Sequence, residues 1–197
     1  MTERLRRHWR TLRWPLWVSA LVLLLAVVGD NARFGLRYER DSILMQHQYW
    51  RLLSGHLVHG SWRHAGLNLV GLWLIASLFR GCYTFRQWLL IVVFAVIAMD
   101  AGFIWLMPEL QWYVGLSGLL HGLLAAGALA WWRMETKPMA LALTLVLIGK
   151  LIWEQWQGAL PLVGELNVIV NAHLYGACGG ALAGICVLAW QRAFARL

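Results

Sequence analysis

The sequence predicts an all-α membrane protein, folded as one compact bundle of six transmembrane helices. Of its 197 residues, 60% are hydrophobic and only 13% are charged, whereas soluble domains are about half apolar and about a quarter charged. The mean hydropathy is +0.60. Long apolar stretches recur along the chain, so we expect a single domain that lies in a bilayer.

Six apolar stretches are predicted to be transmembrane helices, because each is close to the length that crosses the hydrocarbon core. They are 14–29, 57–79, 88–107, 112–132, 139–156 and 168–190. Many of the 14 tryptophans lie near the ends of these spans. Tryptophan is enriched at membrane interfaces, so this distribution supports the assigned boundaries.

The basic residues predict that both termini are cytoplasmic. Most of the 17 lysines and arginines fall in segments on one side of the predicted bundle, and the short outer connections 108–111 and 157–167 contain none. A basic cytoplasmic N-terminus, 1–13, therefore precedes a membrane domain over 14–190, which a cytoplasmic tail, 191–197, follows. The first span also resembles a signal peptide, but no small-residue cleavage motif follows it, so we expect it to be retained.

The net charge of +8 could indicate nucleic-acid binding in a soluble protein. Here the basic residues lie between apolar stretches and form no patch interleaved with aromatic residues, so loop orientation explains them better. We therefore expect the lipid bilayer as a partner and no nucleic acid.

Polar side chains inside predicted spans are costly and mark functional positions. The second, fourth and sixth spans run in the same direction, and each carries such groups near its outer end: His64 and Asn68, Ser117, and His173. At 1.5 Å per residue, Ser117 and His173 lie roughly 8 Å below the outer edge. These side chains are thus predicted to meet at one depth.

This combination suits acyl transfer at a serine. Ser117 would be the nucleophile and His173 the base that takes its proton. His64 and Asn68 are four residues apart, so they share a helical face and can donate hydrogen bonds to one oxyanion. No carboxylate in the sequence is an evident partner of His173, so we expect a Ser-His dyad.

Glycines predict that the fourth and sixth spans pack closely. They recur at intervals of four residues, which is typical of helix contacts in membranes: Gly118 and Gly122, then Gly176, Gly180 and Gly184. Gly115 and Gly118 also leave the backbone around Ser117 uncrowded, so that a main-chain N–H could join an oxyanion hole.

Three motifs follow one another in the chain: WRLLSGHLVHGSWRHAGLN at 50–68, GLSG at 115–118 and AHLYG at 172–176. Together they resemble the second-helix, nucleophile and base motifs of the rhomboid intramembrane serine proteases. The resemblance covers about residues 40–190, which is nearly the whole predicted bundle, and it implies a rhomboid-like fold.

The resemblance also implies roles for individual residues. Ser117 would be the nucleophile, His173 the general base, and His64 and Asn68 the oxyanion donors. The supporting positions would be Trp50 and Arg51 in an outer loop beside the substrate gate, His59 as a structural or water-holding residue, Gly115 and Gly118 at the nucleophile turn, and Gly176 and Gly180 in the helix contact.

One position departs from the family pattern. Many rhomboids have a Tyr or Phe four residues after the nucleophile, where this chain has His121. A histidine there could stack on the base or compete with it.

The wider string GLSGLLHG at 115–122 and the run LRYER at 36–40 resemble a bacterial subfamily, the rhombosortases. That resemblance implies a protease of the bacterial inner membrane whose active site opens toward the periplasm. Its substrates would be single-span membrane proteins with a C-terminal Gly-Gly sorting tail. The acyl group could pass to water or to another nucleophile.

Two other functions fit part of the sequence. A His-lined ion or metal transporter could use His56, His59 and His64, but such a pathway usually also carries carboxylates near the midplane. Only Asp100 qualifies, and we expect it to be a helix-packing partner. A non-catalytic rhomboid-like binder of membrane proteins would lack the nucleophile or the base, and this chain has both.

Lys150 and Glu154 are four residues apart in the fifth span and are expected to form a structural ion pair. The sequence as a whole predicts a serine endopeptidase that needs no metal and no organic cofactor.

Overall fold

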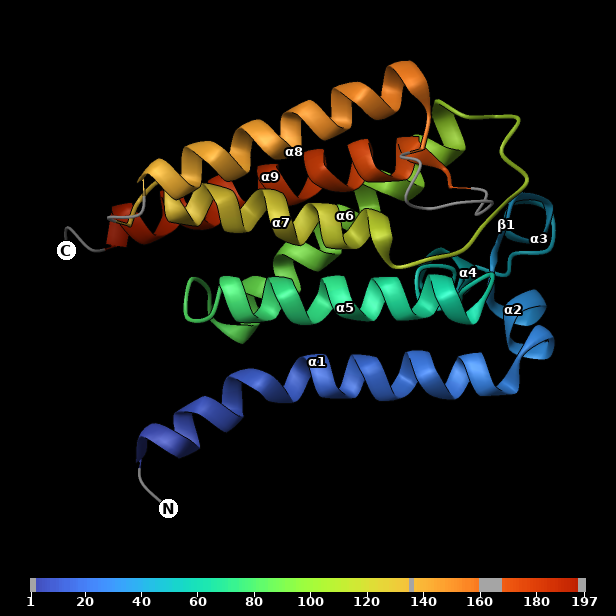
Figure 1. Ribbon diagram of the computed structural model, residues 1–197. Helices are drawn as coiled ribbons and strands as arrows, with labels where there is room; N and C mark the ends of the chain where they lie inside the picture. The colour runs from blue at the N-terminus through green and yellow to red at the C-terminus, as the bar shows by residue number, and fades with distance from the viewer. Residues whose placement is uncertain (1–2, 135–136, 160–167, 195–197) are drawn as a thin grey trace. The chain divides into compact units, whose positions relative to one another are not determined.

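The computed structural model describes residues 3–134, 137–159 and 168–194 (Figure 1). The chain divides into two compact units, a first unit of Met1–Phe85 with Gln111–Leu116 and a second unit of Arg86–Leu110 with Ser117–Leu197. Most of the predicted outer connection 157–167 and the end of the predicted tail 191–197 lie outside the described residues.

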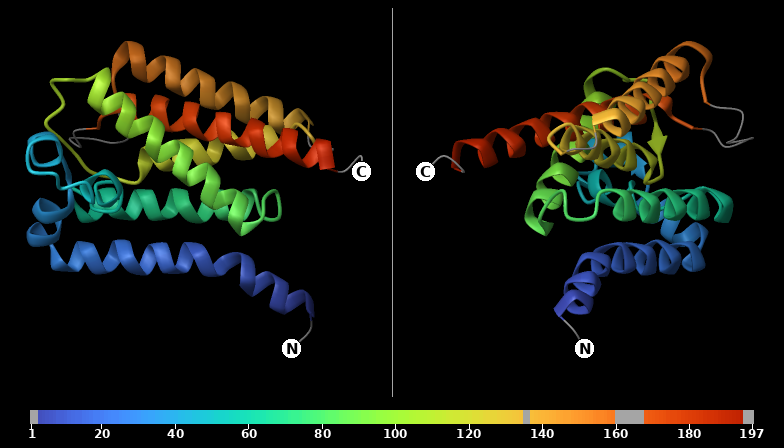
Figure 2. Two further views of the ribbon diagram at one scale, coloured as in Figure 1. Left: turned by 180° about the vertical axis from the view of Figure 1, so that it is seen from behind. Right: turned by 60° about the vertical axis from the view of Figure 1, so that its left-hand side comes forward.

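Two long helices form the body of the first unit, α1 (Glu3–Val28) and α5 (Trp62–Leu78). They pack against each other and lie side by side in both views of the ribbon (Figures 1 and 2). The Trp73 indole donates a hydrogen bond to Ser19 Oγ across this contact, at 3.1 Å. Indole N–H groups need such a partner in an apolar setting, so this bond helps to fix the pairing.

The helix α5 begins five residues later than the predicted second span. Ser61 is its N-cap, and its hydroxyl accepts a hydrogen bond from the His64 backbone N–H at 3.1 Å. A capping serine satisfies one of the free N–H groups of a helix start. The residues before it, 57–61, are therefore not helical.

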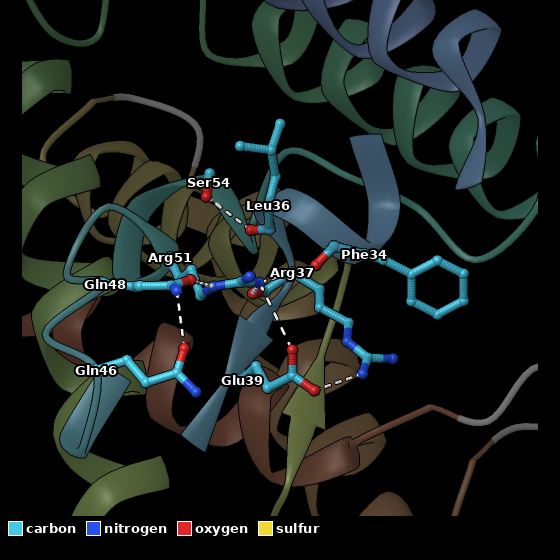
Figure 3. A network of polar contacts seen from close by, with 8 residues as sticks. All are labelled: Phe34, Leu36, Arg37, Glu39, Gln46, Gln48, Arg51 and Ser54. Atoms are coloured by element: carbon cyan, nitrogen blue, oxygen red, sulfur yellow. Dashed lines mark hydrogen bonds and ion pairs between the residues drawn. The ribbon is translucent and has the colours of Figure 1, made fainter. Parts of the chain in front are cut away.

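Short elements connect α1 to α5 in the first unit: α2 (Asp30–Leu36), β1 (Tyr38–Glu39), α3 (Arg40–Leu44) and α4 (Arg51–Ser54). Arg51 holds them together (Figure 3). Its guanidinium donates to the carbonyls of Phe34 and Arg37, both at 2.9 Å, and to Gln48 Oε1 at 2.6 Å. The predicted outer loop is thus an ordered structure built around a buried arginine.

A short antiparallel strand pair departs from the all-α prediction. Tyr38 of β1 pairs with Tyr113 of β2 (Trp112–Tyr113), and the Gly115 N–H donates to Gly55 O at 3.1 Å. The predicted helical start of the fourth span at residue 112 is therefore wrong, because residues 112–113 form a strand bonded to the outer loop and 114–116 are not helical. Ser117 is the first residue of its helix, so its depth cannot be counted in helical steps from residue 112, and the shared depth stays a prediction.

Four helices form the second unit: α6 (Phe85–Trp105), α7 (Ser117–Trp131), α8 (Lys137–Gln157) and α9 (Val170–Phe194). The helices α7, α8 and α9 pack against one another, as both figures show. The helix α6 lies against α9, where Gly102 leaves space for the Tyr175 ring.

The predicted glycine contact between the fourth and sixth spans is confirmed as a contact between α7 and α9. A Cβ on Gly176 would collide with the Gly118 carbonyl, and one on Gly180 would collide with the Gly122 backbone. Only glycine allows two helix backbones to approach this closely.

Three described helices are long and apolar enough to cross a membrane, namely α6, α8 and α9. The segment 13–28 of α1 and the helix α2 meet this test together as a pair bent by 111°, which would make a fourth span. The helix α7 is apolar but shorter, with 15 residues. The chain is thus a multi-pass helical membrane protein, while six spans and cytoplasmic termini stay predictions.

The glycine contact predicts opposite effects for two Gly→Ala substitutions. Gly180→Ala places a methyl group against the α7 backbone, and we expect a loss of about 1–3 kcal/mol of stability from overpacking. Gly149→Ala on α8 meets nothing within 4 Å, and the higher helix propensity of alanine should leave stability equal or higher by up to about 1 kcal/mol. Thermal unfolding of both variants in detergent, followed by tryptophan fluorescence, measures the difference. Equal melting temperatures would contradict the close packing.

Candidate active site

Ser117 and His173 meet where α7 and α9 begin. The Ser117 hydroxyl lies 2.9 Å from His173 Nε2, which is hydrogen-bond distance for a nucleophile and its base. His173 is buried and Ser117 is half-buried. The predicted pairing of these two side chains on separate helices is present in the structure.

Small residues make this meeting possible. A Cβ on Gly118 would lie 2.7 Å from the carbonyl oxygen of Ala172 and would also collide with Met99. Gly118 follows the serine and Ala172 precedes the histidine, so the two helix backbones lie close together directly beside the pair. The lack of a side chain at Gly118 therefore allows Ser117 and His173 to come within hydrogen-bond distance.

A carboxylate also contacts His173, and the prediction of a dyad with no orienting carboxylate is incomplete. Glu154 Oε2 lies 2.8 Å from His173 Nδ1, while Glu154 Oε1 lies 2.6 Å from Lys150 Nζ. The predicted Lys150–Glu154 ion pair is confirmed, but it does not stand alone. One feature of the sequence indicates this contact. Glu154 lies near the outer end of the predicted fifth span, and Ser117 and His173 are also predicted to lie near the outer ends of their spans.

His121 stacks on His173, which was one of the two outcomes that the sequence left open. The His121 and His173 rings have centroids 4.1 Å apart and planes inclined by 16°. His121 Nδ1 lies 2.7 Å from the backbone carbonyl of Ser117, so this nitrogen carries a proton and donates it. The ring thereby covers one face of His173 in the way that an aromatic side chain would.

The predicted oxyanion residues lie in the first unit. Gly115 has a φ of 124°, a backbone conformation that favours glycine, and a Cβ there would lie 2.7 Å from His64 Cε1. Asn68 is buried on α5, and its Nδ2 has no hydrogen-bond partner among the described residues. A buried donor without a partner is costly, so this amide is available to an acceptor that arrives with a substrate.

The remaining predicted positions also lie in the first unit. The His59 ring meets the His64 ring edge-on, with centroids 4.9 Å apart. Trp50 is 55% exposed, whereas Arg51 is buried and holds the outer loop together. The structure thus gives His59 and Arg51 packing or bonding roles around the predicted oxyanion residues and the loop.

One cluster in the described part of the chain has the composition of a metal site. Ligand atoms of His121, Glu154 and His173 all lie within 4.8 Å of one another. The Lys150 ammonium lies 2.6 Å from the same carboxylate and 3.5 Å from His173 Nδ1. A resident cation would have to lie beside this positive charge, so the cluster suits a proton-transfer site better than a metal centre.

A paired serine and histidine on apolar helices define a membrane protein with the side chains of a serine hydrolase. The Rhomboid domain matches residues 46–190, which is most of the chain and includes every member of the cluster. No curated protein matches the sequence. The chain belongs to the rhomboid family, a family of intramembrane serine proteases.

The stacking geometry predicts that His121→Phe keeps most of the reactivity of Ser117. Phenylalanine preserves the ring contact with His173 and loses one hydrogen bond, which contributes about 0.5–1.5 kcal/mol. The rate of labelling by a fluorophosphonate, which reacts with activated serines, should stay within about tenfold of the wild-type rate. A loss of labelling in His121→Phe, with labelling retained in His173→Ala, would instead identify His121 as the base.

Proposed function

We propose that this protein is a serine endopeptidase of the bacterial inner membrane. It hydrolyses a peptide bond in or near the transmembrane segment of its substrate, on the periplasmic side, through an acyl-enzyme on Ser117. The observation that carries the proposal is the 2.9 Å contact between Ser117 Oγ and His173 Nε2, in a chain of the rhomboid family.

The reaction begins when His173 Nε2 accepts the proton of Ser117 Oγ as this oxygen attacks the scissile carbonyl carbon. The tetrahedral intermediate collapses when the C–N bond breaks and His173 returns the proton to the leaving amine. Water from the outer side then attacks the acyl-enzyme with the same histidine as base, and Ser117 is regenerated. Each of these steps uses the serine and the histidine alone, so the proposal includes neither a metal nor a cofactor.

The resemblance to the rhomboid family supplies the proposed oxyanion donors. Asn68 Nδ2, the His64 ring and the backbone near Gly115 would hold the negative charge that develops on the carbonyl oxygen. The unpartnered, buried amide of Asn68 supports its part in this role. Gly115 has a φ that favours glycine, and the His64 ring lies where its side chain would be, which supports a fixed position for the other two.

The proposed substrates are single-span membrane proteins with a C-terminal sorting tail that consists of a Gly-Gly signature, a membrane helix and a basic end. The resemblance to rhombosortases at 115–122 and 36–40 supports this specificity. Helix-breaking glycines also help chemically, because a scissile carbonyl must leave its helical hydrogen bond before it can be attacked. With both termini cytoplasmic, the start of α7 faces the periplasm, where such a tail crosses the membrane.

Processing of a test substrate checks the proposal. The purified protein is reconstituted with a single-span protein that carries a Gly-Gly tail, and the products are identified by mass spectrometry. We expect cleavage by the wild type and at least about a 10³-fold loss in Ser117→Ala and His173→Ala. The matched controls Ser77→Ala and His47→Asn change exposed residues and should retain activity.

Three outcomes of this test would contradict the proposal at different levels. Equal cleavage of a substrate in which Val-Val replaces Gly-Gly would show that the enzyme does not recognise the Gly-Gly signature. Cleavage that survives in Ser117→Ala would show that Ser117 is not the nucleophile. Binding of the substrate without cleavage would favour a non-catalytic binder.

Asn68→Ala should lower kcat by about 10² to 10³, the usual effect of removing one oxyanion donor. The KM should change little, because the interaction forms in the transition state. Steady-state cleavage of the same substrate measures both constants. An unchanged kcat would show that Asn68 does not act on the oxyanion.

A further inference from the structure

We propose that Glu154 is a positioning residue that completes a Ser117–His173–Glu154 triad. The inference rests on the proposed function, since a carboxylate that orients His173 matters to the reaction only where His173 is the base. It assigns to Glu154 a task beyond the structural ion pair with Lys150 that its spacing predicts.

The two contacts of His173 Nδ1 have opposite chemical consequences. Glu154 Oε2 lies 2.8 Å away and can only accept, whereas Lys150 Nζ lies 3.5 Å away and can only donate. A proton on Nδ1 leaves Nε2 free to accept from Ser117, and a proton on Nε2 prevents this. The carboxylate is nearer by 0.7 Å and Lys150 has a better partner in Glu154 Oε1. The geometry therefore selects the tautomer that can act as a base.

Lys150 offsets the cost of burying the Glu154 carboxylate. The Glu154 side chain is 2% exposed and the Lys150 side chain is 26% exposed. The carboxylate is therefore buried, while the lysine side chain is partly exposed. A buried carboxylate is costly without a counter-charge. Lys150 contacts one oxygen and His173 the other, so charge compensation and orientation use different oxygens of the same group.

The role of Glu154 in the reaction follows from this arrangement. When Ser117 attacks, the proton moves from Oγ to Nε2 and His173 becomes an imidazolium, with Nδ1–H still donating to Glu154. The carboxylate keeps its charge throughout and stabilises the imidazolium. Glu154 neither gains nor loses a proton, so it acts through His173 and does not touch the substrate.

Fluorophosphonate labelling tests the inference without a substrate. We expect Glu154→Gln to lower the labelling rate by about 10² to 10⁴, because a glutamine amide can donate to Nδ1 and favour the wrong tautomer. The matched control Glu109→Gln changes an exposed glutamate and should keep the wild-type rate. A wild-type rate in Glu154→Gln would overturn the proposal.

A double variant separates catalysis from stability. Lys150→Met with Glu154→Leu removes both charges, and apolar replacements of a buried pair are often neutral or stabilising. This variant should melt at or above the wild-type temperature and still label as slowly as Glu154→Gln. If the pair were only structural, the folded double variant would label at the wild-type rate.

The tautomer itself can be observed in ¹⁵N-histidine NMR spectra, with His173 assigned as the signals lost in His173→Gln. We expect a protonated Nδ1 in the wild type and a shift of the proton toward Nε2 in Glu154→Gln. An Nε2–H tautomer in the wild type, or the same tautomer in both proteins, would refute the role of Glu154. A wild type that does not label would refute the proposed function instead, and the spectra would still decide the tautomer.

Discussion

The close backbone contact between α7 and α9 is the constraint on which the rest of the site depends. In lipid there is little hydrophobic drive for one helix to leave the acyl chains for another, so packing must hold the helices together. Glycines at 118, 122, 176 and 180 remove the side chains that would separate the two backbones. Ser117 and His173 sit at the start of these helices, and the contact brings them within hydrogen-bond distance. The same glycines that stabilise the bundle thereby determine its chemistry.

A second constraint is the cost of polar groups among apolar helices. Four polar side chains of the second unit form one connected set, in which Lys150, Glu154, His173 and Ser117 each contact the next. His121 closes the set by stacking on His173 and donating to the Ser117 carbonyl. Each group satisfies a neighbour that would otherwise be unpaired. In the first unit Arg51 has the same function for the outer loop, where it bonds two backbone carbonyls.

Much of this arrangement could be predicted from the sequence, and the errors have physical causes. Hydropathy predicted the long helices that the described residues form, and glycine spacing predicted the α7–α9 contact. Neither pattern could show that residues 112–116 are not helical, because backbone bonds of this segment go to β1 and Gly55, far away in the chain. The pairing of Glu154 with His173 was missed because an i, i+4 lysine already explained the carboxylate. Whether His121 stacks or competes depends on ring orientation, which sequence does not encode.

In the proposed mechanism, His173 activates Ser117, which is the single nucleophile of the reaction. The most direct measurement treats the folded, detergent-solubilised protein with a fluorophosphonate and locates the adduct by peptide mass spectrometry. One adduct on Ser117, absent when His173 is replaced by alanine, is the result predicted here. An adduct on another serine, or no adduct on a protein shown to be folded, would contradict it.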